Sequence, residues 1–225
     1  MKWIKHAAAL SAIFLMIGCG SSTDYYFTVK IENTSNTSNL FSPLAPGAWA
    51  VHEKDNLLFT EEQTATNGLE LLAEDGNPTT ILAELQNDDK VIRFAKLSDE
   101  MIAPGNAYSF TTKANEGDYL SFATMFVKSN DLFFAPPQEG LALFPNGTPL
   151  EGDITAKIRL WDCGTEDNQT PGDGDQQPQV GSTTSGVPDP TPLGVRDKAS
   201  FNDGHALPDV ADLIRVTISV SFSAP

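Results

Sequence analysis

Apolar and polar residues alternate most regularly near the two ends of this 225-residue chain. Tyr25–Ile31 has aromatic and β-branched residues at every second position, and residues 214–222 repeat the pattern with Ile, Val and Phe between Arg, Thr and Ser. A period of two is typical of a strand with one buried face. Apolar runs bounded by turn residues predict further strands at 49–52, 91–94, 107–112, 119–128, 139–144 and 157–161.

Residues 64–85 show a different pattern, in which leucines cluster on both sides of a Glu-Asp-Gly-Asn-Pro segment. Glycine is common just after a helix, and proline is tolerated in the first turn of the next one. The region therefore predicts two short helices that are separated at Gly76, with Pro78 opening the second.

Residues 164–208 form a long insertion rich in Gly, Pro, Asp, Gln, Ser and Thr, with too few apolar residues to build a core. A segment of this length without regular structure is usually either disordered or functional. The strand that follows is too short to be a domain, so we expect it to return to the same sheet. The predicted fold is all-β: one antiparallel β-sandwich over residues 25–222, with one or two short helices and a loop excursion at 164–208.

The first 18 residues have the pattern of an export signal. Two lysines precede an apolar run at 7–17, and Gly18 and Cys19 follow it. A positive start, a short apolar stretch and a small residue before the cleavage site define such signals. The apolar run is too short to span a bilayer comfortably.

Cys19, placed directly after a small residue, resembles the lipobox of bacterial lipoproteins, although Met16 stands where Leu is usual. The resemblance implies cleavage after residue 18, acylation of Cys19 and a lipidated tether over 19–24. Gly20, rather than Asp, then favours export to the outer membrane or cell surface, if the source has two membranes. The alternatives are an ordinary signal peptide with an incidental cysteine, and an uncleaved anchor.

The composition is strongly acidic, with 30 Asp and Glu against 14 Lys and Arg and a formal net charge of −16. Such a surface repels nucleic acid and anionic lipid unless a cation intervenes, so no nucleic-acid partner is expected. Solubility outside the cell accounts for most of this charge, and the sharper alternative is that some carboxylates collect a divalent metal. If Cys19 is acylated, Cys163 is left without a partner for an internal disulfide.

Familiar catalytic motifs are absent from the sequence. His52 and Glu53 begin like a zinc-protease helix, but the second His is missing. There is no Gly-x-Ser-x-Gly elbow and no phosphate-binding glycine loop with Lys. His52 and His205 are expected to be structural or exposed, and the chain is predicted not to be an enzyme.

Several segments resemble the spondin N-terminal domain family. They are Phe41–Leu44 with Pro46–His52, Ala65–Leu69 with Ala73–Asn77, Leu120–Met125 with Ser129–Phe134, Leu160–Glu166, and Ala211–Ile218. The Trp-Asp-x-Gly-Thr-acid element at 161–166 is the most specific of these, and the likeness extends over about residues 25–222. It implies a β-sandwich that resembles C2 domains, with a calcium ion (Ca2+) held by loops at one end.

The same resemblance implies which residues hold the metal: Asp131, Asp162 and Glu166. This chain departs from the family pattern at three points. Leu132 replaces the usual Trp, Cys163 stands where Ala is common, and Glu166 stands where Asp is more frequent. Because Glu is one methylene longer than Asp, the position or affinity of the metal can shift.

The residues themselves agree in part with a metal site. Asp162 ends a predicted strand, and a turn at Gly164 can fold Asp162 and Glu166 toward one point. Calcium takes roughly six to eight oxygen ligands, whereas no His or thiol cluster is present to favour zinc or copper. The alternative is that Asp131 and Asp162 cap turns and Glu166 is solvated. The Asp-Gly-Asp run at 173–175 is a weaker candidate for an extra ligand.

Three functions fit these observations. The first is a surface-tethered calcium-binding module of an envelope lipoprotein, which mediates adhesion or binds an extracellular glycan, lipid or protein while its N-terminal lipid enters the membrane. The second is a structural envelope lipoprotein in which the metal only stabilises the fold. The third is a metal-dependent hydrolase, for which the sequence contains neither a clear water activator nor a substrate cleft.

Overall fold

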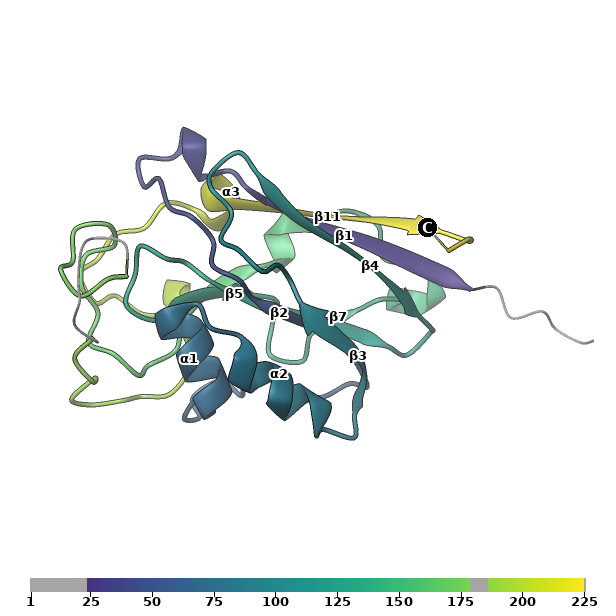
Figure 1. Cartoon of the computed structure of the whole chain (residues 1–225), viewed down its shortest axis with the longest axis horizontal. Coiled ribbons are helices and arrows are strands. Elements are labelled where there is room, and N and C mark those ends of the chain that lie inside the picture. Colours follow the sequence, from purple (N-terminus) through teal and green to yellow (C-terminus); the bar gives the residue numbers. More distant parts are fainter. Residues whose placement is uncertain (1–23, 179–185, 225) are drawn as a thin grey trace, which may run out of the picture.

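Two antiparallel sheets make up most of the computed structural model, which describes residues 24–178 and 186–224 (Figure 1). One sheet contains β1 (Tyr25–Asn33), β4 (Ala107–Ala114), β8 (Gly152–Asp153) and β11 (Ile214–Ser221), in the order β4-β1-β11-β8. The other contains β2 (Ala48–His52), β3 (Val91–Lys96), β5 (Tyr119–Met125), β6 (Leu132–Ala135), β7 (Leu141–Ala142), β9 (Arg159–Asp162) and β10 (Arg196–Asp197). Its order is β10-β9-β6-β5-β2-β3, and β7 pairs with β5. The predicted all-β antiparallel sandwich is confirmed.

The core between the sheets follows from the alternation at the chain ends. β1 and β11 pair along their whole length, with Val29 opposite Ile218 and Ile31 opposite Val216. These four side chains and Phe27 are buried in one apolar cluster that also takes residues from the seven-stranded sheet. Alternate residues such as Lys30 face outward and are exposed. The four-stranded sheet therefore has one buried face and one face in solvent.

Two helices, α1 (Asn67–Asp75) and α2 (Thr79–Gln86), lie along the other side of the seven-stranded sheet (Figure 1). The Thr66 hydroxyl accepts a hydrogen bond from the Leu69 amide at 3.2 Å and so caps α1. Gly76, with φ of 64°, ends the helix in the left-handed conformation that glycine adopts most easily. The prediction of two helices separated at Gly76 is confirmed, and together they bury a second apolar cluster against the sheet.

Burial on both faces explains why periodicity did not predict β6. β6 (Leu132–Ala135) is buried at every position, because its side chains face either the other sheet or the helices. A strand of this kind has no polar face and hence no alternation. The shorter helical elements are η1 (Ser35–Thr37), η2 (Pro145–Gly147), η3 (Thr155–Lys157), η4 (Lys198–Ser200) and α3 (Val210–Leu213).

The insertion at 164–208 changes sheet, which corrects the expectation that the last strand returns to the same one. β9 before the insertion belongs to the seven-stranded sheet, whereas β11 after it belongs to the four-stranded sheet. The connecting segment is long enough to pass from one layer to the other, and on the way it adds β10 to the edge of β9. The insertion therefore adds an edge strand to one sheet and leads the chain to the other.

The predicted signal at 1–18 and the acylated Cys19 lie outside the described residues. Within the described ranges, no helix combines the length and apolar character that a membrane crossing requires.

Candidate metal centre

Asp131 and Asp162 come from neighbouring strands at one end of the seven-stranded sheet. Asp131 directly precedes β6, Asp162 is the last residue of β9, and Leu132 is paired with Asp162 across the two strands. Asp131 is 0% exposed and Asp162 1% exposed. The loops of the insertion gather at this same end, away from the C-terminal end of β11 (Figure 1). The register of the two strands thus places both carboxylates in the interior at the same end of the sheet, near enough for the charge of Asp162 to act on Asp131.

One oxygen of Asp131 organises the turn that follows β9. Its Oδ2 accepts hydrogen bonds from the Thr165 amide at 2.9 Å, the Thr165 hydroxyl at 3.2 Å and the Glu166 amide at 3.1 Å. Gly164, with φ of 70°, permits the sharp change of direction that places these donors. The other oxygen, Oδ1, is buried and has no hydrogen-bond partner among the described residues.

Asp162 has the same divided environment. Its Oδ2 accepts a hydrogen bond from the side-chain amide of Asn168, while its buried Oδ1 finds no partner in the described part of the chain. Buried polar atoms are nearly always paired, and each exception requires an explanation such as a missing ion or water. Two unpartnered carboxylate oxygens on neighbouring strands fit the donor set of a hard cation such as calcium.

Electrostatics at this end disfavour two bare negative charges. Burial, followed by the charge of Asp162, raises the pKa of Asp131 to about 7, although the three hydrogen bonds to Oδ2 oppose this. Burial also raises the pKa of Asp162, against the opposing effects of the Asn168 hydrogen bond and the positive charge of Arg196. Each carboxylate is therefore stabilised by a proton or by a nearby cation.

Glu166 lies on the Asp131 side of this centre and is 8% exposed. Burial, then the charges of Glu74 and Asp131, raise its pKa to about 8. Its carboxylate lies against the backbone of Gly186, where a Cβ atom would collide with it. Across the described ranges, no group of three or more His, Cys, Asp or Glu side chains is already arranged to hold a metal ion. Asp131 and Asp162 thus lie at the same end of the sheet and Glu166 lies beside Asp131, but the three carboxylates do not form a preformed cluster.

Two residues of this centre were not found by sequence reasoning. Asn130 is buried and accepts a hydrogen bond from the Gln169 amide at 3.0 Å. Arg196 lies opposite Asp162 in the register of β10 and β9. Asn130 directly precedes Asp131, which is a usable signal. No local pattern could have found Arg196, because its position depends on the path of the insertion.

The weaker candidates at 173–175 have a more exposed environment than the two aspartates. Asp173 and Asp175 are exposed, and Asp175 accepts a hydrogen bond from the Gln169 side chain at 2.9 Å. They keep this loop solvated and joined to its neighbours.

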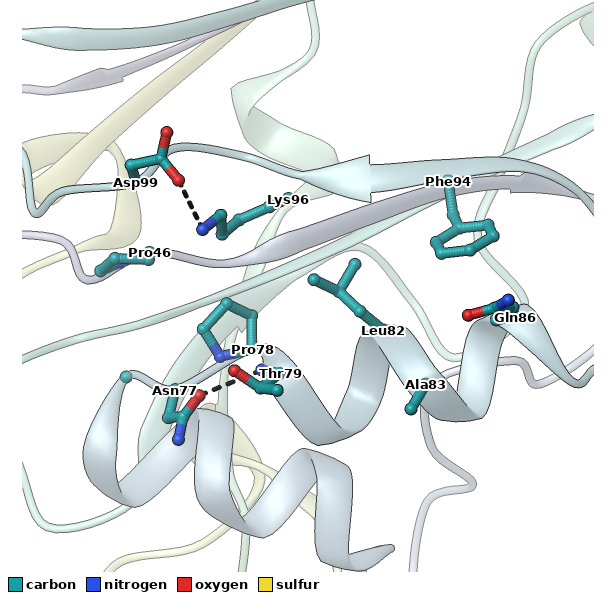
Figure 2. A pocket seen from close by; sticks show the side chains of 11 residues that line it. Pro46, Asn77, Pro78, Thr79, Leu82, Ala83, Gln86, Phe94, Lys96 and Asp99 are labelled. Carbon is teal, nitrogen blue, oxygen red and sulfur yellow. Dashed lines mark hydrogen bonds and ion pairs between the residues drawn. The ribbon is translucent and has the colours of Figure 1, made fainter.

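A separate hollow of 540 Å³ lies between α2 and β3, remote in sequence from both aspartates (Figure 2). Leu82 and Phe94 line it, while Lys96 is paired with Asp99 and the Thr79 amide donates to Asn77 at 3.1 Å. None of its lining side chains is among the buried polar groups that lack a partner in the described residues. The unsatisfied carboxylates therefore distinguish the metal centre from this hollow.

Comparison with known proteins finds a match to one protein family. The family model Spondin_N matches residues 35–186, which is more than half of the chain. No curated protein matches the sequence. The matched region includes the turn after β5, the whole of β6 and β9, and the Trp-Asp-x-Gly-Thr-acid element. The chain belongs to the spondin N-terminal domain family, a family of non-enzymatic extracellular adhesion or binding modules.

Proposed function

We propose that this protein is a calcium-binding module of the cell envelope that engages an extracellular ligand. The observation that carries the proposal is the pair of buried, unpartnered oxygens, Oδ1 of Asp131 and Oδ1 of Asp162, on adjoining strands. A divalent cation between them would satisfy both oxygens and neutralise charge that burial makes unfavourable.

Asp131 and Asp162 would hold the ion, with Glu166 as the third carboxylate. The remaining ligands would be carbonyl and amide oxygens of the surrounding loops, in keeping with calcium's preference for oxygen. When bound, the ion supplies positive charge and a crosslink between loops. Asp131 already joins the β5–β6 turn to the 164–166 turn through its three hydrogen bonds, so both loops would become more rigid together.

The ligand would be a glycan, a lipid or a protein that contacts the ordered loops. The net charge of −16 disfavours nucleic acid. Acylated Cys19 would tether the module to the outer membrane or cell surface.

The competing function is a structural envelope lipoprotein whose metal only stabilises the fold. Its support is the deep burial of Asp131 and Asp162, which keeps an ion between them away from solvent. Both functions predict that calcium stabilises the protein, but only the adhesion module predicts calcium-dependent capture of a glycan, lipid vesicle or protein ligand.

Calcium titration of the purified protein by calorimetry, together with thermal melts in calcium and in EDTA, tests the metal site. At one hundred times the dissociation constant, calcium should raise the free energy of unfolding by about 2.7 kcal/mol. Asp162→Asn should remove most of this gain, and Glu166→Gln should remove less, because its longer side chain is more easily replaced by water.

The matched control is Asp153→Asn, since Asp153 is an exposed aspartate that pairs with Arg215 at 2.9 Å in the other sheet. It should leave the calcium response unchanged. A wild-type melting temperature that calcium does not move would refute the proposal.

Fractionation of cells that produce Cys19→Ser tests the anchor. The variant should be unprocessed or released, because it has no thiol to acylate, whereas the wild type should remain with the membranes. A mature-sized Cys19→Ser protein that still fractionates with membranes would show that the anchor lies elsewhere.

A further inference from the structure

Arg196 faces the candidate metal centre from the neighbouring strand. β10 and β9 are antiparallel, and their register places Arg196 directly opposite Asp162. Directly opposed residues on an antiparallel pair project from the same face, with Cβ atoms about 5 Å apart. The insertion therefore delivers a cationic side chain to the position beside one of the two buried carboxylates.

The two facing side chains carry opposite charges, and each has one atom without a hydrogen-bond partner in the described residues. Nε of Arg196 is a buried donor, Oδ1 of Asp162 is a buried acceptor, and neither has a hydrogen-bond partner within the described ranges. The Arg196 guanidinium instead lies over the ring of Phe201, 4.0 Å from its centroid. A cation at that distance is attracted to the aromatic face, so this ring is an alternative resting place for the charge.

The Phe201 ring is itself held in place by Lys198, which precedes it by three residues. Lys198 Nζ lies 4.7 Å from the ring centroid, and it also donates to Asp203 Oδ1 at 2.9 Å. Lys198 is almost wholly buried, so this support has little freedom to move. The partners within reach of Arg196 thus include the aromatic ring that it contacts, the carboxylate across the strand, and Asp203, which lines the same hollow as Arg196 and has a buried Oδ2 without a partner in the described residues.

We propose that Arg196 is the resident cation of this centre: it exchanges between Phe201, which it contacts in this structure, and the Asp162 carboxylate across the strand, from which calcium displaces it. This inference depends on the calcium site proposed above. Arg196 and calcium then compete for one carboxylate, so Arg196 sets the affinity of the site and keeps the metal-free centre from carrying two uncompensated charges.

Calcium affinity of Arg196→Gln, measured by calorimetry, is the direct test. Removal of a positive charge this close to a buried carboxylate should tighten calcium binding roughly ten-fold or more. Arg159→Gln is the matched control, because Arg159, the first residue of β9, also lies over an aromatic ring and also faces an aspartate. Its guanidinium is 5.9 Å from the centroid of Trp161, and it forms an ion pair with Asp197 at 2.7 Å. The control should bind calcium like the wild type. Unchanged or weaker binding by Arg196→Gln would overturn the inference.

Phe201→Leu provides a second, opposite prediction. Without the aromatic ring, Arg196 loses its resting place and returns to Asp162, so calcium should bind a few times more weakly than to the wild type. Equal or tighter binding would contradict the exchange between the two partners.

Melts in EDTA separate this inference from the calcium proposal. Without metal, Arg196→Gln should lower the melting temperature more than Arg159→Gln does, because the buried aspartates lose their counter-charge. If neither the wild type nor Arg196→Gln binds calcium, the proposed function fails, and the comparison in EDTA still decides whether Arg196 compensates Asp162. Equal losses in the two variants would refute that role.

Discussion

Two buried polar groups at opposite ends of β5 differ in whether the protein satisfies them. His52, 0% exposed, is paired with Tyr119 at the start of β5; its Nδ1 lies 2.6 Å from the Glu53 carbonyl oxygen, and its Nε2 lies 2.9 Å from the Ser121 hydroxyl. Asp131, beyond the other end of β5, and its neighbour Asp162 each keep one buried oxygen without a partner in the described residues.

The difference separates a structural group from a binding group. The carbonyl at Nδ1 makes that nitrogen the protonated one, so Nε2 accepts a hydrogen bond from the Ser121 hydroxyl and the neutral ring is fully paired. The aspartates are incomplete, because an unpaired buried carboxylate oxygen loses its hydration without compensation. One end of the sheet is complete in itself, and the other requires a cation or a proton.

Stability without calcium should fall as pH rises, which is the largest effect that we expect from the acidic end. The pKa of Asp131 is raised to about 7, above its unfolded value near 4, so the folded state holds the proton more tightly. Its contribution is fully present below about pH 4 and is lost as pH rises through 7, by up to about 1.4 kcal/mol per pH unit for one proton.

Thermal melts in EDTA between pH 5 and 8 would measure this trend. Asp131→Asn should reduce the slope, because the amide does not titrate, while the raised pKa values of Glu166 and Asp162 leave part of it, and saturating calcium should reduce it in the wild type. A wild-type protein that becomes more stable in EDTA as pH rises from 5 to 8 would contradict the contrast between the two ends of the sheet.

His52→Leu should lower the free energy of unfolding by roughly 1–3 kcal/mol, because it leaves the Ser121 hydroxyl and Glu53 carbonyl without partners. Burial lowers the pKa of His52, so its neutral form stabilises the fold above about pH 6.5, and this is lost as pH falls further. The contribution of His52 to stability therefore changes with pH in the opposite direction to that of the aspartates. Chemical denaturation at pH 7.5 and pH 5 would test both statements.

His205→Leu is the control, since His205 is partly exposed and contacts the Thr170 hydroxyl at 3.0 Å. It should change stability little. Retention of the low-pH loss in His52→Leu would show that another group causes it.

Thiol labelling should give the smallest effect, because Cys163 is expected to be inert. It is 0% exposed, and burial raises the pKa of its thiol well above the usual value. In a Cys19→Ser background, a thiol reagent should label the folded protein no faster than it unfolds and should label it fully in denaturant. Fast labelling of the folded protein would place this thiol at an accessible, reactive surface.

Local patterns were sufficient for much of the fold. Alternation predicted β1 and β11, because each has one face on the core and one in solvent. Gly76 and the surrounding leucines predicted α1 and α2, because helix ends depend on neighbouring residues. The same patterns missed β6, whose two buried faces erase alternation, and β10, whose two residues form a strand only beside β9.

The sequence by itself determined the family, the sandwich and the candidates Asp131 and Asp162, because these depend on short motifs and on periodicity. Only the tertiary structure decided that Asp131 and Asp162 are both buried at one end of the sheet, that β11 crosses to the other sheet, and that Arg196 faces Asp162. These features depend on strand register and on the path of a long insertion, which long-range pairing sets and no local pattern encodes.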